Sequence, residues 1–166
     1  MNVIAAVDEN RGIGLNNSLL FSIPEDRKFF KEKTIGKTVV MGRETLESLP
    51  CGLPLAGRRN IVLTRNTGFS VAGAIICHDI AELKESLSGY PDDEIYIIGG
   101  ESVYNQLLDY CSRAFITKVH AVRKADRFFP NLDLMDNWHI VSESKNFVHE
   151  GIKFSFVEYF NSDRIT

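Results

Sequence analysis

The first two thirds of the chain alternate short apolar runs with segments of helical pattern. Apolar runs of this length, bounded by glycine or polar residues, are typical of strands that are buried on both faces. Strands that alternate with helices predict a parallel sheet with helices on both sides. The predicted strands are Asn2–Val7, Thr38–Met41, Asn60–Thr64, Gly73–Cys77 and Glu94–Gly100. The predicted helices are a segment that begins near Pro24, Glu44–Leu49, Asp79–Leu87 and a segment after Gly100 that extends to about Leu108.

The last third of the chain has a different pattern. Three strand-like segments follow one another without a helix: Arg113–Val122, Trp138–Ser144 and Ile152–Phe160. In the third segment apolar residues at even positions, such as Phe154, alternate with Lys153, Ser155 and Val157, which predicts one buried and one solvent-exposed face. We therefore expect antiparallel strands at one edge of the sheet. The predicted fold is a single α/β domain, residues 1–166, with a mixed, mostly parallel eight-stranded central sheet, about four flanking helices and antiparallel strands at the C-terminal edge.

Two signals mark the start of the first helix, and they differ by one residue. Pro24 suits the first helical turn, because its missing N–H group would have no partner there. Ser22 and Glu25 match the S-x-x-E pattern of a capping box.

This helix also carries an acidic residue on its apolar side. At about 100° per residue, Asp26 points in the direction of Phe29 and Phe30. Lys33 lies on the same side and weakens the pattern. One interpretation is that an acid in the first turn complements the helix dipole. The other is that Asp26 lies at the floor of a cleft and pairs with a cationic or N–H-rich ligand, because an unpaired buried carboxylate is costly.

The composition restricts the class of protein. The chain has 166 residues, 44% apolar and 25% charged, which is ordinary for one globular domain. The net charge of −3 gives no electrostatic support for nucleic-acid binding. Three widely spaced cysteines, Cys51, Cys77 and Cys111, indicate reduced thiols in a cytoplasmic protein. The histidine spacing predicts no metal site, and we expect neither a signal peptide nor a membrane span.

Small or basic residues follow three of the predicted strands. Ligands bind beyond the carboxyl ends of parallel strands. Gly42-Arg43 and Gly99-Gly100 precede helices, where free N–H groups attract phosphate, and Thr64-Arg65 adds a hydroxyl and a guanidinium group. Two arginines suit a phosphate monoester, so the pattern indicates NADP rather than NAD. Glu44 would repel a phosphate, and each glycine pair alone is more often a helix-entry turn. Neither a P-loop nor a complete G-x-G-x-x-G motif is present.

Seven motifs then occur in order, and together they match one family: IAAVDENRGIG, FSIPEDRKFFK, VVMGRETLESL, PLAGRRNIVLT, YIIGGESVY, AFITKV and DRFFPNL. With these motifs the chain resembles bacterial dihydrofolate reductases over nearly its whole length. The resemblance implies a cytoplasmic, monomeric, NADPH-dependent oxidoreductase of one-carbon metabolism. It would reduce 7,8-dihydrofolate to tetrahydrofolate by hydride transfer to C6 and protonation of N5. Its partners would be this substrate and antifolate inhibitors, with no nucleic acid and no membrane.

The resemblance also implies roles for individual residues. Asp26 would accept hydrogen bonds from the pterin 2-amino group and N3–H, Thr117 would anchor its carboxylate, and Arg58 would bind the glutamate α-carboxylate of the substrate. The implied catalytic residues are Asp26, Thr117, Tyr104, Phe21 and Leu19. The implied substrate-binding residues are Ile4, Ala5, Asp26, Phe30, Leu49, Leu55, Arg58, Ile98 and Thr117. The implied cofactor-binding residues are Ala6, Ile13, Gly14, Leu19, Gly42, Arg43, Glu44, Thr45, Leu63, Thr64, Arg65, Ile98, Gly99, Gly100, Ser102, Val103 and Tyr104.

Several positions depart from the family pattern. Leu20 and Phe21 stand where many members have proline and tryptophan, so an indole N–H group that usually holds a water is absent. Glu44 and Ser102 stand where histidine and a basic residue are frequent near the cofactor phosphates, and Ala125 replaces a common glycine. The Asp8–Ile23 loop is expected to act as a lid, and the Gly99-Gly100 peptide is cis in the family.

Two other functions are compatible with parts of the pattern. One is the related reductase domain of riboflavin synthesis, which has a similar sheet and cofactor but would not need the S-x-P-E-D-x-x-x-F segment. The other is a nucleotide-binding regulatory module without chemistry, against which Asp26, Tyr104 and Thr117 argue.

Overall fold

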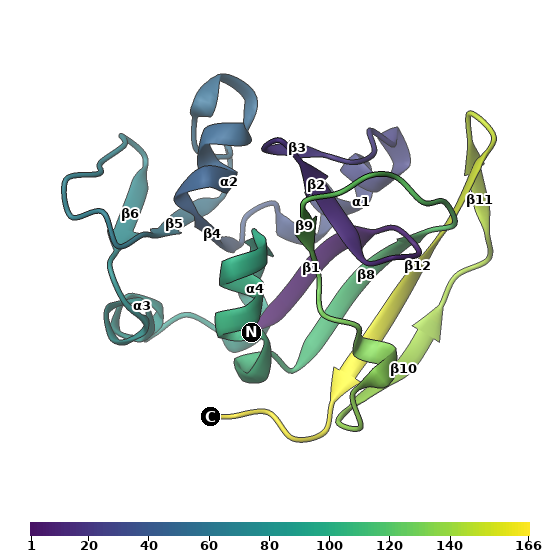
Figure 1. The fold of residues 1–166 in the computed structure, drawn as a ribbon. Helices are drawn as coiled ribbons and strands as arrows, with labels where there is room; N and C mark the ends of the chain where they lie inside the picture. The colour runs from purple at the N-terminus through teal and green to yellow at the C-terminus, as the bar shows by residue number, and fades with distance from the viewer.

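The computed structural model describes all 166 residues and contains a central nine-stranded sheet (Figure 1). Its strands are β1 (Asn2–Val7), β4 (Thr38–Gly42), β5 (Arg59–Leu63), β6 (Ala74–Cys77), β7 (Ile95–Gly99), β8 (Arg113–Val119), β10 (Trp138–Glu143), β11 (Phe147–His149) and β12 (Ile152–Asn161). Eight strands form the continuous order β10-β12-β8-β1-β7-β4-β5-β6, and β11 pairs with β12. The six strands from β8 to β6 in this order are parallel, whereas β10, β11 and β12 pair antiparallel. The predicted fold class is therefore confirmed.

The four predicted helices are present and cover the two faces of the sheet. They are α1 (Pro24–Thr34), α2 (Arg43–Ser48), α3 (Ile80–Leu87) and α4 (Glu101–Leu107), and short 3₁₀ helices cover Pro50–Gly52, Asp92–Glu94, Leu108–Tyr110 and Leu132–Leu134. Successive residues of one strand belong to different cores. Val40 packs in the core that contains Leu83 of α3, and Val39 packs in the core that contains Leu46 of α2 and Phe30 of α1. Burial on both faces explains the continuous apolar runs in these strands.

The segment predicted as a loop, Asp8–Ser22, contains a short hairpin that the pattern did not predict. Its strands β2 (Gly12–Leu15) and β3 (Ser18–Leu19) form a second sheet with β9 (Arg127–Phe128), in the order β3-β2-β9. Gly14 of β2 lies in register with Arg127 of β9. Figure 1 shows the hairpin and α2 at the same end of the molecule. A segment from the last third of the chain is thereby attached to the loop that follows β1.

The start of α1 follows the proline signal and not the capping-box signal. The N-cap residue is Ile23, Pro24 is the first helical residue, and no side chain caps the helix. The Ser22 hydroxyl instead accepts a hydrogen bond from the Arg27 guanidinium. The predicted capping box is therefore wrong: the N-cap residue is Ile23, one position after Ser22, and no side chain accepts from a helix N–H group there.

The predicted solvent-exposed face of β12 is correct at Lys153 but wrong at Ser155 and Val157. Ser155 is fully buried and Val157 is 2% exposed. Val157 belongs to the larger core, which also contains Leu132 and Trp138 from the part of the chain that precedes β12. The period-two pattern gave the strand correctly but could not show what covers its second face.

Candidate active site

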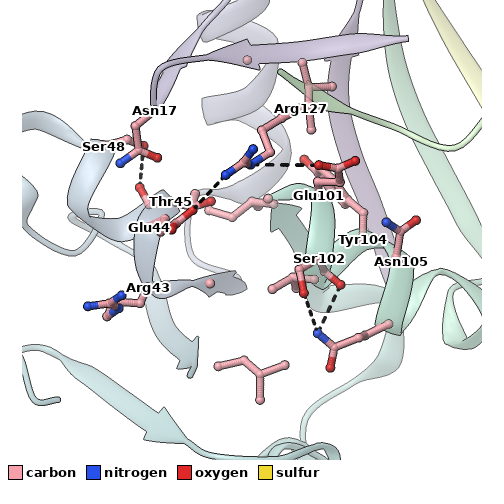
Figure 2. Close-up of a pocket in the computed structure, with 18 of the residues that line it drawn as sticks. Asn17, Arg43, Glu44, Thr45, Ser48, Glu101, Ser102, Tyr104, Asn105 and Arg127 are labelled. Atoms are coloured by element: carbon pink, nitrogen blue, oxygen red, sulfur yellow. Dashed lines mark hydrogen bonds and ion pairs between the residues drawn. The ribbon is translucent and has the colours of Figure 1, made fainter. Parts of the chain in front are cut away.

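A cleft of about 940 Å³ opens at the carboxyl ends of the parallel strands (Figure 2). Residues of β1, the β2–β3 hairpin, α2, the end of β5 and α4 line it. All of the residues implied as cofactor-binding line this cleft except Gly99, and so do the implied substrate-binding residues Ala5 and Ile98. The structure thus brings together residues that lie up to about a hundred positions apart. Lining residues that sequence reasoning missed are Asn17, Ser18, Ser48, His78, Asp79, Glu101, Asn105, Gln106 and Arg127.

The turn between β7 and α4 forms one wall of the cleft. The Gly99–Gly100 peptide is cis, as the resemblance implies, and Gly99 has φ +119°. A Cβ atom on Gly99 would lie 3.2 Å from two ring carbons and the hydroxyl oxygen of Tyr104, and one on Gly100 would lie 3.3 Å from the Thr45 hydroxyl oxygen. A Cβ atom on Gly42 would likewise lie 3.2 Å from a Val103 methyl group. Glycine is therefore needed here because α4 and α2 pack directly against the turn.

Tyr104 connects this wall to the central strand. Its hydroxyl donates a 2.8 Å hydrogen bond to the Ile4 carbonyl, and its ring packs edge-on against Phe129. Burial, with a smaller contribution from the charge of Asp26, raises the pKa of Tyr104 far above its ordinary value. Tyr104 is therefore a permanent hydrogen-bond donor that fixes β1 where Ala5 enters the cleft.

Asp26 and Thr117 form a hydrogen-bonded pair on the α1 side of the sheet. The Thr117 hydroxyl donates to Asp26 Oδ1 at 2.6 Å, and Asp26 Oδ2 accepts no hydrogen bond from the protein. Burial raises the pKa of Asp26 above its ordinary value, while the Thr117 hydrogen bond and the charge of Arg27 oppose this shift. The predicted inward direction of Asp26 is thus what the structure has. One carboxylate oxygen is fixed by the protein and the other is available to a ligand.

Of the other implied substrate-binding residues, all but Ala5 and Ile98 lie outside the cleft lining. The side chains of Phe30, Leu49, Leu55 and Ile98 pack against the core that contains Ile4. Of this apolar group, Ile98 also lines the cleft, so the apolar region and the cleft meet at that residue. The arrangement suits a flat, partly apolar ligand that reaches from Asp26 toward the cleft.

Arg58 lies at the end of this apolar region, beside the carboxyl end of α1. Its Nε donates to the Thr34 hydroxyl at 3.1 Å, and its Nη1 donates to the Ala56 carbonyl at 3.0 Å. Burial lowers the pKa of Arg58 from its ordinary value, but the guanidinium group remains charged. The buried Asn60 amide supports the same loop by hydrogen bonds with the backbone of Leu55 and Arg58. These contacts fix a guanidinium where an anionic tail could bind.

Two of the implied catalytic residues, Leu19 and Phe21, lie differently from the rest. Leu19 lines the cleft but is 80% exposed at its rim. Phe21 does not line the cleft and packs against the small core of Ile23, Val119 and Phe154. The guanidinium carbon of Arg123 lies 4.2 Å from the centroid of the Phe21 ring. The structure therefore places Leu19 at the cleft and Phe21 in the base of the loop.

Two carboxylates hold the loop that carries Leu19, one at its start and one at the turn between β2 and β3. Buried Asp8 accepts hydrogen bonds from the Asn10, Gly12 and Arg123 backbone N–H groups. At the turn, the Asn16 N–H group donates to Asp126 at 3.1 Å. These contacts attach the loop to the segment that contains β9 and place it over the cleft.

Comparison with known proteins identifies the family. The family model described as dihydrofolate reductase matches residues 1–161. The chain belongs to the dihydrofolate reductase family. It is 38% identical to a dihydrofolate reductase of Neisseria gonorrhoeae over 161 residues, which is 96% of each chain. It is 36% identical to a dihydrofolate reductase of Bacillus subtilis over 145 residues, which is 87% of this chain and 83% of the relative.

A solved dihydrofolate reductase structure shares the fold. The Enterococcus faecalis enzyme, complexed with NADP(H) and RAB-propyl, superposes with a TM-score of 0.87 at 33% identity, covering 98% of this chain and 96% of that one. The family resemblance drawn from the seven motifs is therefore confirmed. None of the helices is long and apolar enough to cross a membrane.

Proposed function

We propose that this chain reduces 7,8-dihydrofolate to tetrahydrofolate with NADPH. The observation that carries the proposal is the half-buried Asp26 carboxylate, fixed by Thr117 on one oxygen, beside a cleft suited to a phosphorylated dinucleotide. Membership of the dihydrofolate reductase family supports this activity. It does not favour the riboflavin-pathway reductase or a module without chemistry. Cytoplasmic location, a monomeric state and a single domain of 166 residues are part of the proposal.

The cleft residues fit NADPH, which supplies the hydride when it is bound. Arg43, Arg65 and the hydroxyl groups of Thr45 and Thr64 line one part of the cleft. Guanidinium and hydroxyl groups are the donors that phosphate monoesters require. In the proposal these residues hold the phosphates, and the residues around Ala6 and Ile98 hold the nicotinamide end. The cofactor would thus be oriented between β1 and α4.

Asp26 binds the pterin and promotes its protonation in this proposal. Its free oxygen accepts from the 2-amino group and N3–H of the substrate, and such charge-assisted hydrogen bonds are worth roughly 1.5–3 kcal/mol. The negative charge also favours a proton at N5, which a water delivers because the carboxylate binds the other side of the ring. Thr117 keeps the carboxylate in the required orientation. Arg58 binds the α-carboxylate of the substrate tail.

Methotrexate binding provides a test of this site that needs no turnover. In calorimetric titrations the wild-type chain should bind methotrexate, and saturation with NADPH should increase that affinity. Asp26→Asn should bind NADPH as the wild type does but should lose methotrexate affinity by about tenfold or more. Asp93→Asn, a change at an acidic residue away from the site, is the matched control and should change neither affinity. A folded wild-type protein that does not bind methotrexate would contradict the proposal.

A further inference from the structure

Arg127 lies in the cleft between two carboxylates that come from different helices. Its Nη2 is 3.9 Å from Glu44 Oε2 on α2, and its Nε is 4.0 Å from Glu101 Oε2 on α4. Figure 2 shows the guanidinium reaching across the cleft toward both groups. The pairing of β9 with β2 places Arg127 opposite Gly14, which also lines the cleft. The position of this charge is therefore set by the small sheet and not by the elements that hold Arg43 and Arg65.

The charges of the cleft make Arg127 important for an anionic ligand. The lining contains three arginines, and three carboxylates oppose them: Glu44, Asp79 and Glu101. Arg43 is already 3.6 Å from Glu47 Oε1, outside the cleft lining. A diphosphate placed near Glu44 and Glu101 would be repelled by both. Arg127 is the cation that lies between them.

The present contacts of Arg127 are easily exchanged. Its side chain is 52% exposed, the N–O distances of both ion pairs are long, and neither pair includes a hydrogen bond. The one hydrogen bond of its guanidinium is with the neighbouring Asp126 carbonyl at 3.1 Å. Exposed ion pairs of this kind contribute little to stability, whereas a guanidinium binds two phosphate oxygens bidentately. A phosphate would therefore be a better partner than either carboxylate.

We propose that Arg127 is a cofactor-binding residue that exchanges Glu44 and Glu101 for the diphosphate of the dinucleotide. The proposal rests on the proposed function, because it takes NADPH as the ligand. Arg127 compensates for Glu44 and Glu101, two of the three acidic residues that line the cleft. Since the diphosphate is common to NADPH and NADH, Arg127 contributes to the affinity for both. Arg65 contributes to the discrimination between them.

Titrations of NADPH and NADH into four proteins test this assignment: the wild type, Arg127→Gln, Arg127→Lys and Arg65→Gln. Arg127→Gln should weaken both dinucleotides by a similar factor of about tenfold, as for the loss of one charge-assisted contact. Arg127→Lys should keep part of the affinity. Raising the salt concentration should weaken NADPH binding less in Arg127→Gln than in the wild type, because fewer charges take part. Unchanged dissociation constants, within about twofold, in Arg127→Gln would overturn the proposal.

A variant that lacks both carboxylates distinguishes direct binding of the diphosphate by Arg127 from simple neutralisation of Glu44 and Glu101. In Glu44→Gln/Glu101→Gln, the further change Arg127→Gln should still weaken both dinucleotides several-fold, as expected for a lost phosphate contact. If it has no effect there, Arg127 only neutralises the carboxylates and the proposal fails. A wild-type protein that binds no NADPH would overturn the proposed function as well. Wild-type binding that Arg127→Gln does not alter would overturn this inference alone.

Discussion

Asp26→Asn should lower kcat for dihydrofolate at neutral pH by about 100-fold or more, the size expected when a group that promotes proton transfer is removed. Asparagine keeps the volume and can still accept from the Thr117 hydroxyl, which lies 2.6 Å from Asp26 Oδ1. It removes the negative charge that favours a proton on N5. The variant should therefore bind NADPH normally and fail at the protonation step. Steady-state rates at saturating NADPH measure this change.

The pH profile distinguishes this role from general damage. In Asp26→Asn, activity should increase as the pH falls, because more of the substrate in solution already carries the proton. Thr117→Val keeps the charge and loses only the anchoring hydroxyl, so its loss of kcat should be smaller. Wild-type activity of Asp26→Asn at neutral pH would contradict the role assigned to Asp26.

The same variant should be more stable than the wild type at neutral pH. Burial raises the pKa of Asp26 in the folded protein above its ordinary value of 3.8. The folded state therefore holds this proton more tightly than the unfolded state, and ionisation reduces stability as the pH rises through that interval. Asp26→Asn should therefore raise the Tm at neutral pH, as thermal unfolding followed by circular dichroism would show. The difference should disappear below pH 3.8, where the aspartate is neutral in both states.

Arg65→Gln should weaken NADPH binding by about 10- to 100-fold and NADH binding much less. Arg65 lines the cleft after β5 and makes neither an ion pair nor a side-chain hydrogen bond within the protein, so its guanidinium is free to bind a phosphate. Arg43, at 3.6 Å from Glu47, is partly neutralised and should have the smaller effect. Direct titration of both dinucleotides gives the ratio of affinities.

The matched control for this prediction is Arg59→Gln. Arg59 stacks on Tyr90 with 3.9 Å between the guanidinium carbon and the ring centroid, and it does not line the cleft. The Arg59→Gln substitution removes one positive charge from the protein, as Arg65→Gln does, but it removes no group from the site. An equal loss of NADPH and NADH affinity in Arg65→Gln would show that Arg65 does not bind the phosphate that distinguishes them.

The sequence was sufficient for the central sheet because burial leaves a local signal. Runs such as Asn2–Val7 are apolar on both faces, and the observed β1 has the same bounds. The direction of Asp26 also followed from helix geometry alone. The strand ends at Gly42-Arg43 and Thr64-Arg65 were correctly grouped, because parallel strands carry their carboxyl ends to one edge.

Features set by distant contacts could not be predicted in this way. The pairing of Gly14 with Arg127 joins segments more than a hundred residues apart, and its strands are too short to have a periodic pattern. Arg127 was therefore missed at the cleft. The burial of Ser155 is likewise not predictable from the alternation of β12, because the local pattern does not show which residues cover that face. The partner of Asp26, Thr117, came from the family resemblance and not from the local pattern.

The central claim is tested most directly by steady-state oxidation of NADPH by the purified chain with 7,8-dihydrofolate, with NADH measured in parallel. The account predicts oxidation that depends on dihydrofolate and that is much faster with NADPH than with NADH at low cofactor concentration. Formation of tetrahydrofolate in equal amount to the NADPH consumed should accompany it. A folded protein that oxidises neither cofactor in the presence of dihydrofolate would contradict the account.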